Sequence, residues 1–235
     1  MTTNIRCRDT SWLGQANCKL CTLRRGALFA GLSDEVLDRL LMPVDQMVFG
    51  AKAVLYQEGE PAHHVFSIRE GLVKLTQAAP NGSSRIVRFL SAGDAAGLEA
   101  LSDGGYRHTA EAIAATQVCR IPAENLVEIN RQYSPLFEEL TRRWQDSLDR
   151  ANEVITQLST GTAQGRVARF LLNTLSSPED NSCLALPRED MASLLSLTVE
   201  TVSRTVAEFK RRDLLEEKRG LFYFDRAGLA HAATL

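Results

Sequence analysis

The sequence predicts an α+β fold in which a small β-roll is followed by a long helix and a C-terminal helical domain. Apolar and polar residues alternate with a period of two between about residues 44 and 122, which is typical of short strands. Between 123 and 160 the apolar residues recur every three or four positions, which indicates a helix with one apolar face. We therefore divide the chain into an N-terminal arm (1–26), a roll domain (27–122), a long helix (123–160) and a C-terminal domain (161–235).

Composition sets the broad class of the protein. The 235 residues are 44% hydrophobic and 24% charged, enough for one large core or two modest ones and too apolar for general disorder. The formal net charge of -2 lends no support to binding a polyanion. No run of roughly 18 apolar residues and no secretory signal is present, so we expect a cytoplasmic protein that does not enter a membrane. Cysteines in that compartment are free thiols, metal ligands or redox sensors more often than disulfides.

The N-terminal arm has cysteines but little apolar periodicity. Cys7, Cys18 and Cys21 lie among arginines and a lysine, and we expect the arm to need something beyond its own side chains to become ordered. Residues 32–40 predict a short helix that Ser33 can cap.

Short strands and regularly spaced turns predict the roll domain. Residues 65–68, 72–75 and 85–89 alternate apolar and polar side chains. Pro80-Asn81-Gly82 is a strong hairpin signal between the last two of these strands. Further turns are marked by glycines 59, 71, 82 and 93. This spacing is typical of a small barrel or roll.

The long helix carries one apolar stripe. Its members are Phe137, Leu140, Trp144, Leu148, Ala151, Ile155 and Leu158. The stripe could pack on its own domain or pair with a second copy as a coiled coil. The near-heptad spacing favours pairing, and we assign the dimer contact to Leu140, Trp144, Leu148 and Ile155.

Two short helices near the C-terminus are joined by a tight connection. We expect one over 188–195 and a second from Val199 to about Arg212, with Thr198 as its N-cap. Two helices joined by about three residues fit a helix-turn-helix. The first residues of the second helix of such a motif point into the major groove of DNA.

The residue types at that helix start suit base reading. Arg204 can donate two hydrogen bonds to guanine, Glu200 can accept one from cytosine, and Val199 can contact a thymine methyl group. Ser203 is an adaptable donor and acceptor. Phosphate contacts are assigned to Arg188, Thr198 and Thr201, and the buried side to Val202, Val206 and Phe209. The pattern alone leaves open an ordinary helical hairpin with a surface Glu200–Arg204 pair.

One run of eight residues resembles the recognition helix of the CRP/FNR family, and of its FNR branch in particular. This run is Leu197-Thr198-Val199-Glu200-Thr201-Val202-Ser203-Arg204. Residues 71–74, Gly82 and residues 91–94 resemble that family's β-roll, so the resemblance covers nearly all of the chain after residue 26. It implies a cyclic-nucleotide-binding-like double-stranded roll that acts as a sensor, a winged helix-turn-helix, and a homodimer that binds double-stranded DNA and RNA polymerase. It also implies TTGAT-type half-sites read by Glu200, Ser203 and Arg204, and it favours base reading over the surface pair.

The resemblance counts against a cyclic nucleotide as the effector. In the family members that bind a cyclic nucleotide, the resemblance implies a Gly-Glu pair followed by an Arg-Ser or Arg-Thr pair that binds the phosphate. Here Gly97 is followed by Leu98, and His108 takes the arginine-like position because Arg107 is one residue out of register. The phosphate would lose its bidentate partner.

The cysteines resemble the ligand set of FNR-type proteins. Cys7, Cys18 and Cys21 in the arm, with Cys119 in the segment 116–122, would supply the four thiolates of a [4Fe–4S] cluster. The spacing departs from the usual arm because no cysteine follows Cys21 there, so Cys7 must close a longer loop. That closure costs little extra entropy.

Other assignments of these residues remain open. Cys119 also suits a small buried position, and Cys18 with Cys21 suits a zinc pair or a reversible disulfide. Cys183 is expected to play no part in a cluster. Haem or nitric oxide sensing through His63, His64 or His108 is a further alternative.

No phosphate loop, serine elbow or paired-carboxylate motif is present, so we do not expect an enzyme. Outside gene regulation, the alternative is a nucleotide-binding regulatory subunit.

Overall fold

The computed structural model describes residues 10–16, 44–80, 82–102, 104–132, 134–173 and 181–234. The chain forms two compact units, residues 1–84 with 89–148 and residues 85–88 with 149–235. Cys7, Cys18, Cys21 and the helix predicted over 32–40 lie outside the described residues. Among the helices that are described, none has the length and apolar character needed to cross a bilayer.

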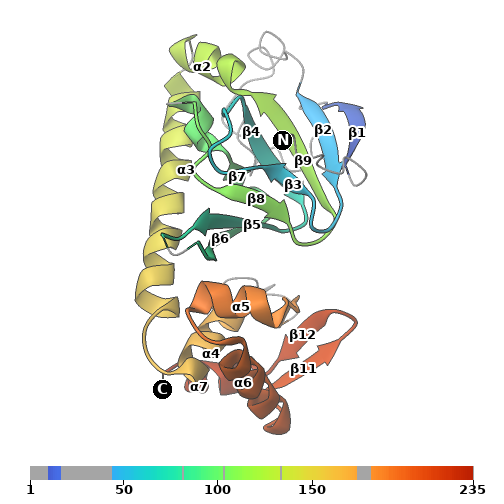
Figure 1. Cartoon of the computed structure of the whole chain (residues 1–235), viewed down its shortest axis with the longest axis vertical. Helices are drawn as coiled ribbons and strands as arrows, with labels where there is room; N and C mark the ends of the chain where they lie inside the picture. The colour runs from blue at the N-terminus through green and yellow to red at the C-terminus, as the bar shows by residue number, and fades with distance from the viewer. Residues whose placement is uncertain are drawn as a thin grey trace. The chain divides into compact units, whose positions relative to one another are not determined.

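Two antiparallel sheets build the first unit (Figure 1). The five-stranded sheet has, in spatial order, β1 (Thr10–Gln15), β2 (Asp45–Phe49), β9 (Thr116–Pro122), β4 (His64–Glu70) and β7 (Ala95–Ala96). The four-stranded sheet has β3 (Val54–Tyr56), β8 (Thr109–Ala112), β5 (Val73–Ala78) and β6 (Ser84–Leu90). A short 3-10 helix, η3 (Leu98–Leu101), follows β7. The predicted roll is thus confirmed, with strands at each of the three segments that the alternation had marked.

Alternation along the strands places one set of apolar side chains inside the roll. On β5, Val73 and Leu75 are buried while Lys74 between them is only half-buried. The turn before this strand needs Gly71, which has a φ of 96° and no room for a side chain. A Cβ there would lie 2.5 Å from the Thr116 hydroxyl. The hairpin expected near residues 80–82 joins β5 to β6, and Ala79 N–H donates to Ser83 O across it at 2.7 Å.

Part of the N-terminal arm is a strand, which the sequence did not predict. β1 pairs with β2, Gly14 opposite Gln46, through a register shift between Trp12 and Gly14. The indole Nε1 of Trp12 donates to Asp45 Oδ1 at 2.9 Å. Main-chain pairing with a sheet edge therefore orders this segment without an apolar pattern of its own.

The predicted single helix over 123–160 is wrong in one respect, because two α-helices occupy that range. These are α2 (Ala123–Gln132) and α3 (Ser134–Glu153), and α3 continues into a π-helical turn, η4 (Val154–Leu158). Proline is tolerated in the first turn of a helix, where no N–H is needed, and disrupts a helix interior. Pro135 is the second residue of α3, so its position favours a new helix start there. Leu126 of α2 is fully buried and belongs to the core of the roll.

The apolar residues of α3 do not all lie on one face. Leu140 is 6% exposed and packs in the core cluster of its own domain, with Leu126 and Ile121. Its assignment to a dimer contact is therefore corrected. Three positions later, Arg143 is buried too, and its guanidinium donates to the main-chain oxygen of Gly93.

Other apolar side chains of this region are exposed. The exposed fractions are 59% for Phe137, 48% for Trp144, 55% for Leu148 and 63% for Ile155 in η4. Phe137, Trp144 and Leu148 belong to the first unit, and their spacing of seven and four residues matches a heptad seam. Leu140 is outside that pattern, and Ile155 lies in the second unit. We call Phe137, Trp144 and Leu148 the exposed seam.

The second unit is a helical domain with a small sheet. Its elements are α4 (Ala163–Asn173), β10 (Ser182–Leu184), α5 (Arg188–Leu195), α6 (Val199–Arg211), β11 (Leu215–Lys218), β12 (Leu221–Phe224) and α7 (Arg226–Ala233). The three strands lie in the order β10-β12-β11. The large side chains of Phe170, Phe209 and Phe222 are buried at its core. The expected helix pair is present, and β11 and β12 form a hairpin after it.

Candidate DNA interface

The connection between α5 and α6 is a tight turn fixed by main-chain geometry. Ser196 adopts the left-handed conformation with a φ of 54°, and Leu197 N–H donates to Ala192 O at 3.0 Å. Thr198 then caps α6, because its hydroxyl accepts from Thr201 N–H at 3.1 Å. The side chain of Arg166 on α4 donates to Leu195 O at 3.2 Å and holds the end of α5. These contacts set where α6 begins.

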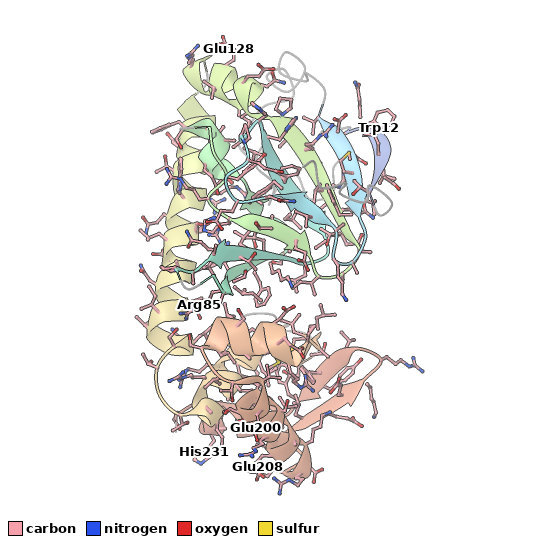
Figure 2. All side chains as sticks on the ribbon, in the orientation of Figure 1. Trp12, Arg85, Glu128, Glu200, Glu208 and His231 are labelled. Atoms are coloured by element: carbon pink, nitrogen blue, oxygen red, sulfur yellow. The ribbon has the colours of Figure 1, made fainter. Side chains whose placement is uncertain are left out.

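The buried and exposed faces of α6 separate as the sequence predicted. Val202, Val206 and Phe209 are buried with at most 2% exposure. The predicted base-reading residues are all exposed, namely Val199, Glu200, Ser203 and Arg204. The structure thus brings these four side chains together at the solvent-facing start of one helix, on which Figure 2 labels Glu200.

Two of the polar base-reading groups form a pair. Arg204 Nη2 forms an ion pair with Glu200 Oε1, one helical turn away, and both side chains are more than 70% exposed. Exposed pairs of this kind contribute little to stability. The surface pair and the base reader are therefore compatible, since the pair can open to DNA at small cost.

The predicted phosphate contacts have different environments. Thr198 and Thr201 lie at the start of α6 with their hydroxyl oxygens 2.8 Å apart. Arg188 is not a free cation, because its Nη2 binds Glu217 Oε2 at 2.9 Å and its guanidinium lies 5.1 Å from the centre of the Phe222 ring. The sequence had identified Arg188 but not its carboxylate partner, which lies 29 positions along the chain.

The hairpin of β11 and β12, which we call the wing, has exposed cations that the sequence did not lead us to assign. Lys218 and Arg219 lie at its turn, where Arg219 and Gly220 both have positive φ. Lys218 Nζ contacts Glu216 Oε1 at 2.7 Å. A pair of cations beside a glycine turn is a sequence signal that could have been used.

Cys119 is the one predicted cluster ligand within the described residues. It is half-buried on β9, packs against the roll core, and its sulfur lies 4.0 Å from Arg69 Nη1. No group of three histidine, cysteine or acidic side chains that could hold a metal occurs among the described residues. Cys183 is buried in the second unit, and burial raises the pKa of its thiol to about 12.

In the roll, an acidic side chain binds the segment that resembles the family's phosphate site. Glu99 Oε1 lies 3.3 Å from His108 Nδ1 and accepts from Arg107 N–H at 3.2 Å. Burial alone would raise the pKa of Glu99, but the hydrogen bonds from His108 and the main chain outweigh it and hold the pKa below its usual value. An anionic carboxylate therefore already binds these two groups.

Comparison with known proteins decides the family. A cyclic nucleotide-binding domain model matches residues 46–133, and a Crp-like helix-turn-helix domain model matches residues 165–232. The transcriptional activator protein anr of Pseudomonas aeruginosa is 30% identical over 214 residues, which cover 86% of each chain. The chain belongs to the CRP/FNR family. The fumarate and nitrate reduction regulatory protein of Vibrio cholerae is 28% identical over 86% of this chain and 84% of its own length.

Solved structures of the CRP/FNR family agree with the fold. FixK2 from Bradyrhizobium japonicum has a TM-score of 0.72 at 27% identity, over 81% of this chain and 98% of its own. A CRP-family transcriptional regulator from Thermus thermophilus has a TM-score of 0.69 at 26% identity, over 80% and 96%. The protein is accordingly a DNA-binding transcription regulator of CRP/FNR type, and α5 with α6 is its helix-turn-helix.

Proposed function

We propose that this regulator is a cytoplasmic homodimer that reads TTGAT-type inverted repeats through α6 and responds to oxygen or redox state. The observation that carries the DNA part is the exposed start of α6, where Glu200, Ser203 and Arg204 lie together above a fully buried face. Arg204 suits a guanine edge and Glu200 a cytosine amino group. Regulation through RNA polymerase is part of the proposal, and the name of the Pseudomonas relative describes a transcriptional activator.

The exposed seam supports the homodimer. Single exposed apolar residues are common, but a row of them at heptad spacing favours a partner. A second copy of the same helix offers a matching row by symmetry. Two recognition helices related by a two-fold axis then fit half-sites that are one DNA turn apart.

The sheet that holds Cys119 supports the redox part of the proposal. Gln46 of β2 lies opposite both Gly14 of β1 and Cys119 of β9, so the arm runs two strands away from Cys119. Ala16, which follows β1, packs against the same core cluster as Cys119. Cys18 comes two residues later in the sequence. The described part of the arm therefore ends beside the core cluster that Cys119 also contacts.

The residues present fit the donor set of an iron–sulfur centre. Cys119 is partly accessible, and Arg69 Nη1 donates to its sulfur at 4.0 Å. We propose Cys7, Cys18, Cys21 and Cys119 as the ligands of a [4Fe–4S] cluster, which when bound would supply reactivity toward oxygen. The protein's part is to tie the arm to β9 and thereby bias the pairing of the seam. Such a bias requires that the tied arm favours the paired state over the unpaired state.

A cyclic nucleotide is the competing effector, because the matched family model describes a domain that binds one. The Glu99 carboxylate argues against it, since this anion lies on His108 and Arg107 N–H and would repel a phosphate at the same place. Two further alternatives are oxidation of Cys18 and Cys21 as thiols, and sensing of nitric oxide or haem. Neither uses a set of four thiolates, and the following experiment distinguishes them from the cluster.

The experiment is anaerobic purification with iron and acid-labile sulfide assays and a visible spectrum before and after air. We expect iron, sulfide and a visible band that air bleaches, together with DNA binding that air weakens. Cys119→Ser should lose all of these, while Cys183→Ser is the matched control and should keep them. Protein without acid-labile sulfide that still binds the inverted repeat would contradict the cluster and leave the DNA-reading proposal intact.

A further inference from the structure

One carboxylate in the wing binds two cations from the two helices of the DNA-binding motif. Glu217 on β11 accepts from Arg188 Nη2 of α5 at 2.9 Å and from Lys210 Nζ of α6 at 2.7 Å, and both bonds end on the same oxygen, Oε2. The side chains of Glu217, Arg188 and Lys210 are 35%, 24% and 40% exposed. These three side chains are thus partly shielded from water but can still be reached by a ligand that binds at the surface.

Other contacts hold Arg188 in this place. Its guanidinium lies over the Phe222 ring, and Nη1 donates to Leu186 O at 3.3 Å. The hydrogen bond from Lys210 is the main reason that the pKa of Glu217 is lowered, and the bond from Arg188 adds to it against the opposing effect of burial. Glu217 is therefore ionised at neutral pH, and its single negative charge offsets part of the charge of the two cations.

The first helix of a helix-turn-helix crosses the DNA backbone while the second enters the groove. Arg188 is the first residue of that first helix, so it lies where a phosphate would approach. A phosphate and a carboxylate both prefer the guanidinium fork, and they compete for the same N–H donors.

We propose that Glu217 is a specificity-determining residue that competes with DNA phosphates for Arg188 and Lys210 and so limits sequence-independent binding. Phosphate contacts dominate affinity for any DNA, whatever its sequence. A resident carboxylate reduces that general term and leaves the base contacts of Arg204 untouched. The ratio of specific to non-specific affinity rises as a result. This inference rests on the proposed docking of α6 in the major groove.

The test measures binding of the full-length anaerobic protein to an inverted-repeat duplex and to a duplex of unrelated sequence, over a series of salt concentrations. Glu217→Gln keeps the size and an acceptor oxygen but removes the charge. We expect it to bind the unrelated duplex roughly two- to fivefold more tightly, as for gain of one charged contact. The slope of log K against log salt should steepen by about 0.9 for each phosphate newly contacted.

Two further variants identify the cause. Glu216→Gln removes the same charge from the residue that precedes Glu217 in β11, and the carboxylate of Glu216 pairs with Lys218 instead. This control variant should steepen the slope of log K against log salt less than Glu217→Gln does. In a background that carries both Arg188→Gln and Lys210→Gln, Glu217→Gln should lose most of its effect, because both released cations are gone.

The possible failures have distinct signatures. An unchanged slope in Glu217→Gln, an equal change in Glu216→Gln, or weaker binding of both duplexes would each overturn the inference. Wild-type protein that does not distinguish the two duplexes, or a specificity unaffected by Arg204→Ala, would instead contradict the proposed function.

Discussion

Replacing Trp144 by alanine tests whether the exposed seam is the dimer contact. The indole is 48% exposed in the single chain, although large aromatic side chains are normally covered. Its neighbours on the seam, Phe137 and Leu148, are exposed to a similar extent. If two helices pair along this row, Trp144 loses that exposed area on dimerisation and its truncation removes the contact from both chains.

The exposed fraction sets the size of the effect. A tryptophan has about 250 Å² of surface, so 48% exposure leaves roughly 120 Å² for a partner to cover. At about 25 cal/mol per Å² this area is worth about 3 kcal/mol per chain and about 6 kcal/mol per symmetric dimer as an upper limit. Incomplete coverage reduces it, and we expect about 3 kcal/mol in total, which weakens dimerisation roughly 100-fold.

Sedimentation equilibrium of anaerobic protein measures this change, with DNA binding to a full and a half inverted repeat as the functional readout. Arg142→Ala is the matched surface control, since Arg142 is 56% exposed and pairs with Glu139 and Asp146 of its own helix. Leu140→Ala is the matched core control and should lower the free energy of unfolding by about 2–5 kcal/mol. A Trp144→Ala protein that dimerises like wild type would refute the seam as the contact.

Three further predictions concern individual contacts. Arg204→Ala should relax the preference for guanine at one position by about 1–3 kcal/mol, whereas Thr201→Ala should weaken binding to all sequences. Competition assays with altered duplexes measure both effects. If the two variants act alike on every duplex, the roles assigned to these residues of α6 are wrong. Arg169→Ala should lower the free energy of unfolding by about 2–3 kcal/mol in urea titrations, because its guanidinium donates to three main-chain oxygens at two helix ends; a change below about 0.5 kcal/mol would count against this. The hydrogen bond from Arg120 is the main reason that the pKa of Asp45 lies below its ordinary 3.8. The contribution of the Asp45 carboxylate is therefore fully present above pH 3.8 and is lost as pH falls through the lowered pKa. Asp45→Asn should cost less than about 1 kcal/mol at pH 7, and this cost should shrink as the pH of the unfolding measurement is lowered through that range.

The sequence pattern predicted the elements well where local signals set them. The roll strands follow from alternation and from turns such as Gly71, whose neighbours leave no room for a side chain. The start of α6 follows from the Thr198 cap. The sequence pattern could not predict β1, because Thr10–Gln15 pairs with the edge of β2 and has no apolar alternation of its own.

The errors at the site have a common physical cause. Leu140 lies four positions before Trp144, which is also a neighbour spacing on a helix, so periodicity alone could not tell the core face from the seam. Leu140 in fact faces the roll with Arg143. In the same way, Arg188 had the right residue type for a phosphate, but its carboxylate partner Glu217 is distant in sequence. Partners that tertiary structure supplies leave no local trace.

The formal net charge of -2 looks like an objection to a DNA-binding protein, but the pairing of charges in the second unit answers it. Several cations around α6 and the wing have a carboxylate neighbour: Arg204 has Glu200, Arg211 has Glu208, Lys218 has Glu216, and Arg188 and Lys210 share Glu217. Under the proposed docking, these cations exchange one ion pair for another when they bind DNA. Each exchange has a small cost that reduces the gain from phosphate contacts, so base contacts supply a larger share of the net affinity. On this proposal, a weakly acidic chain reads DNA selectively because its carboxylates weaken the contacts that carry no sequence information.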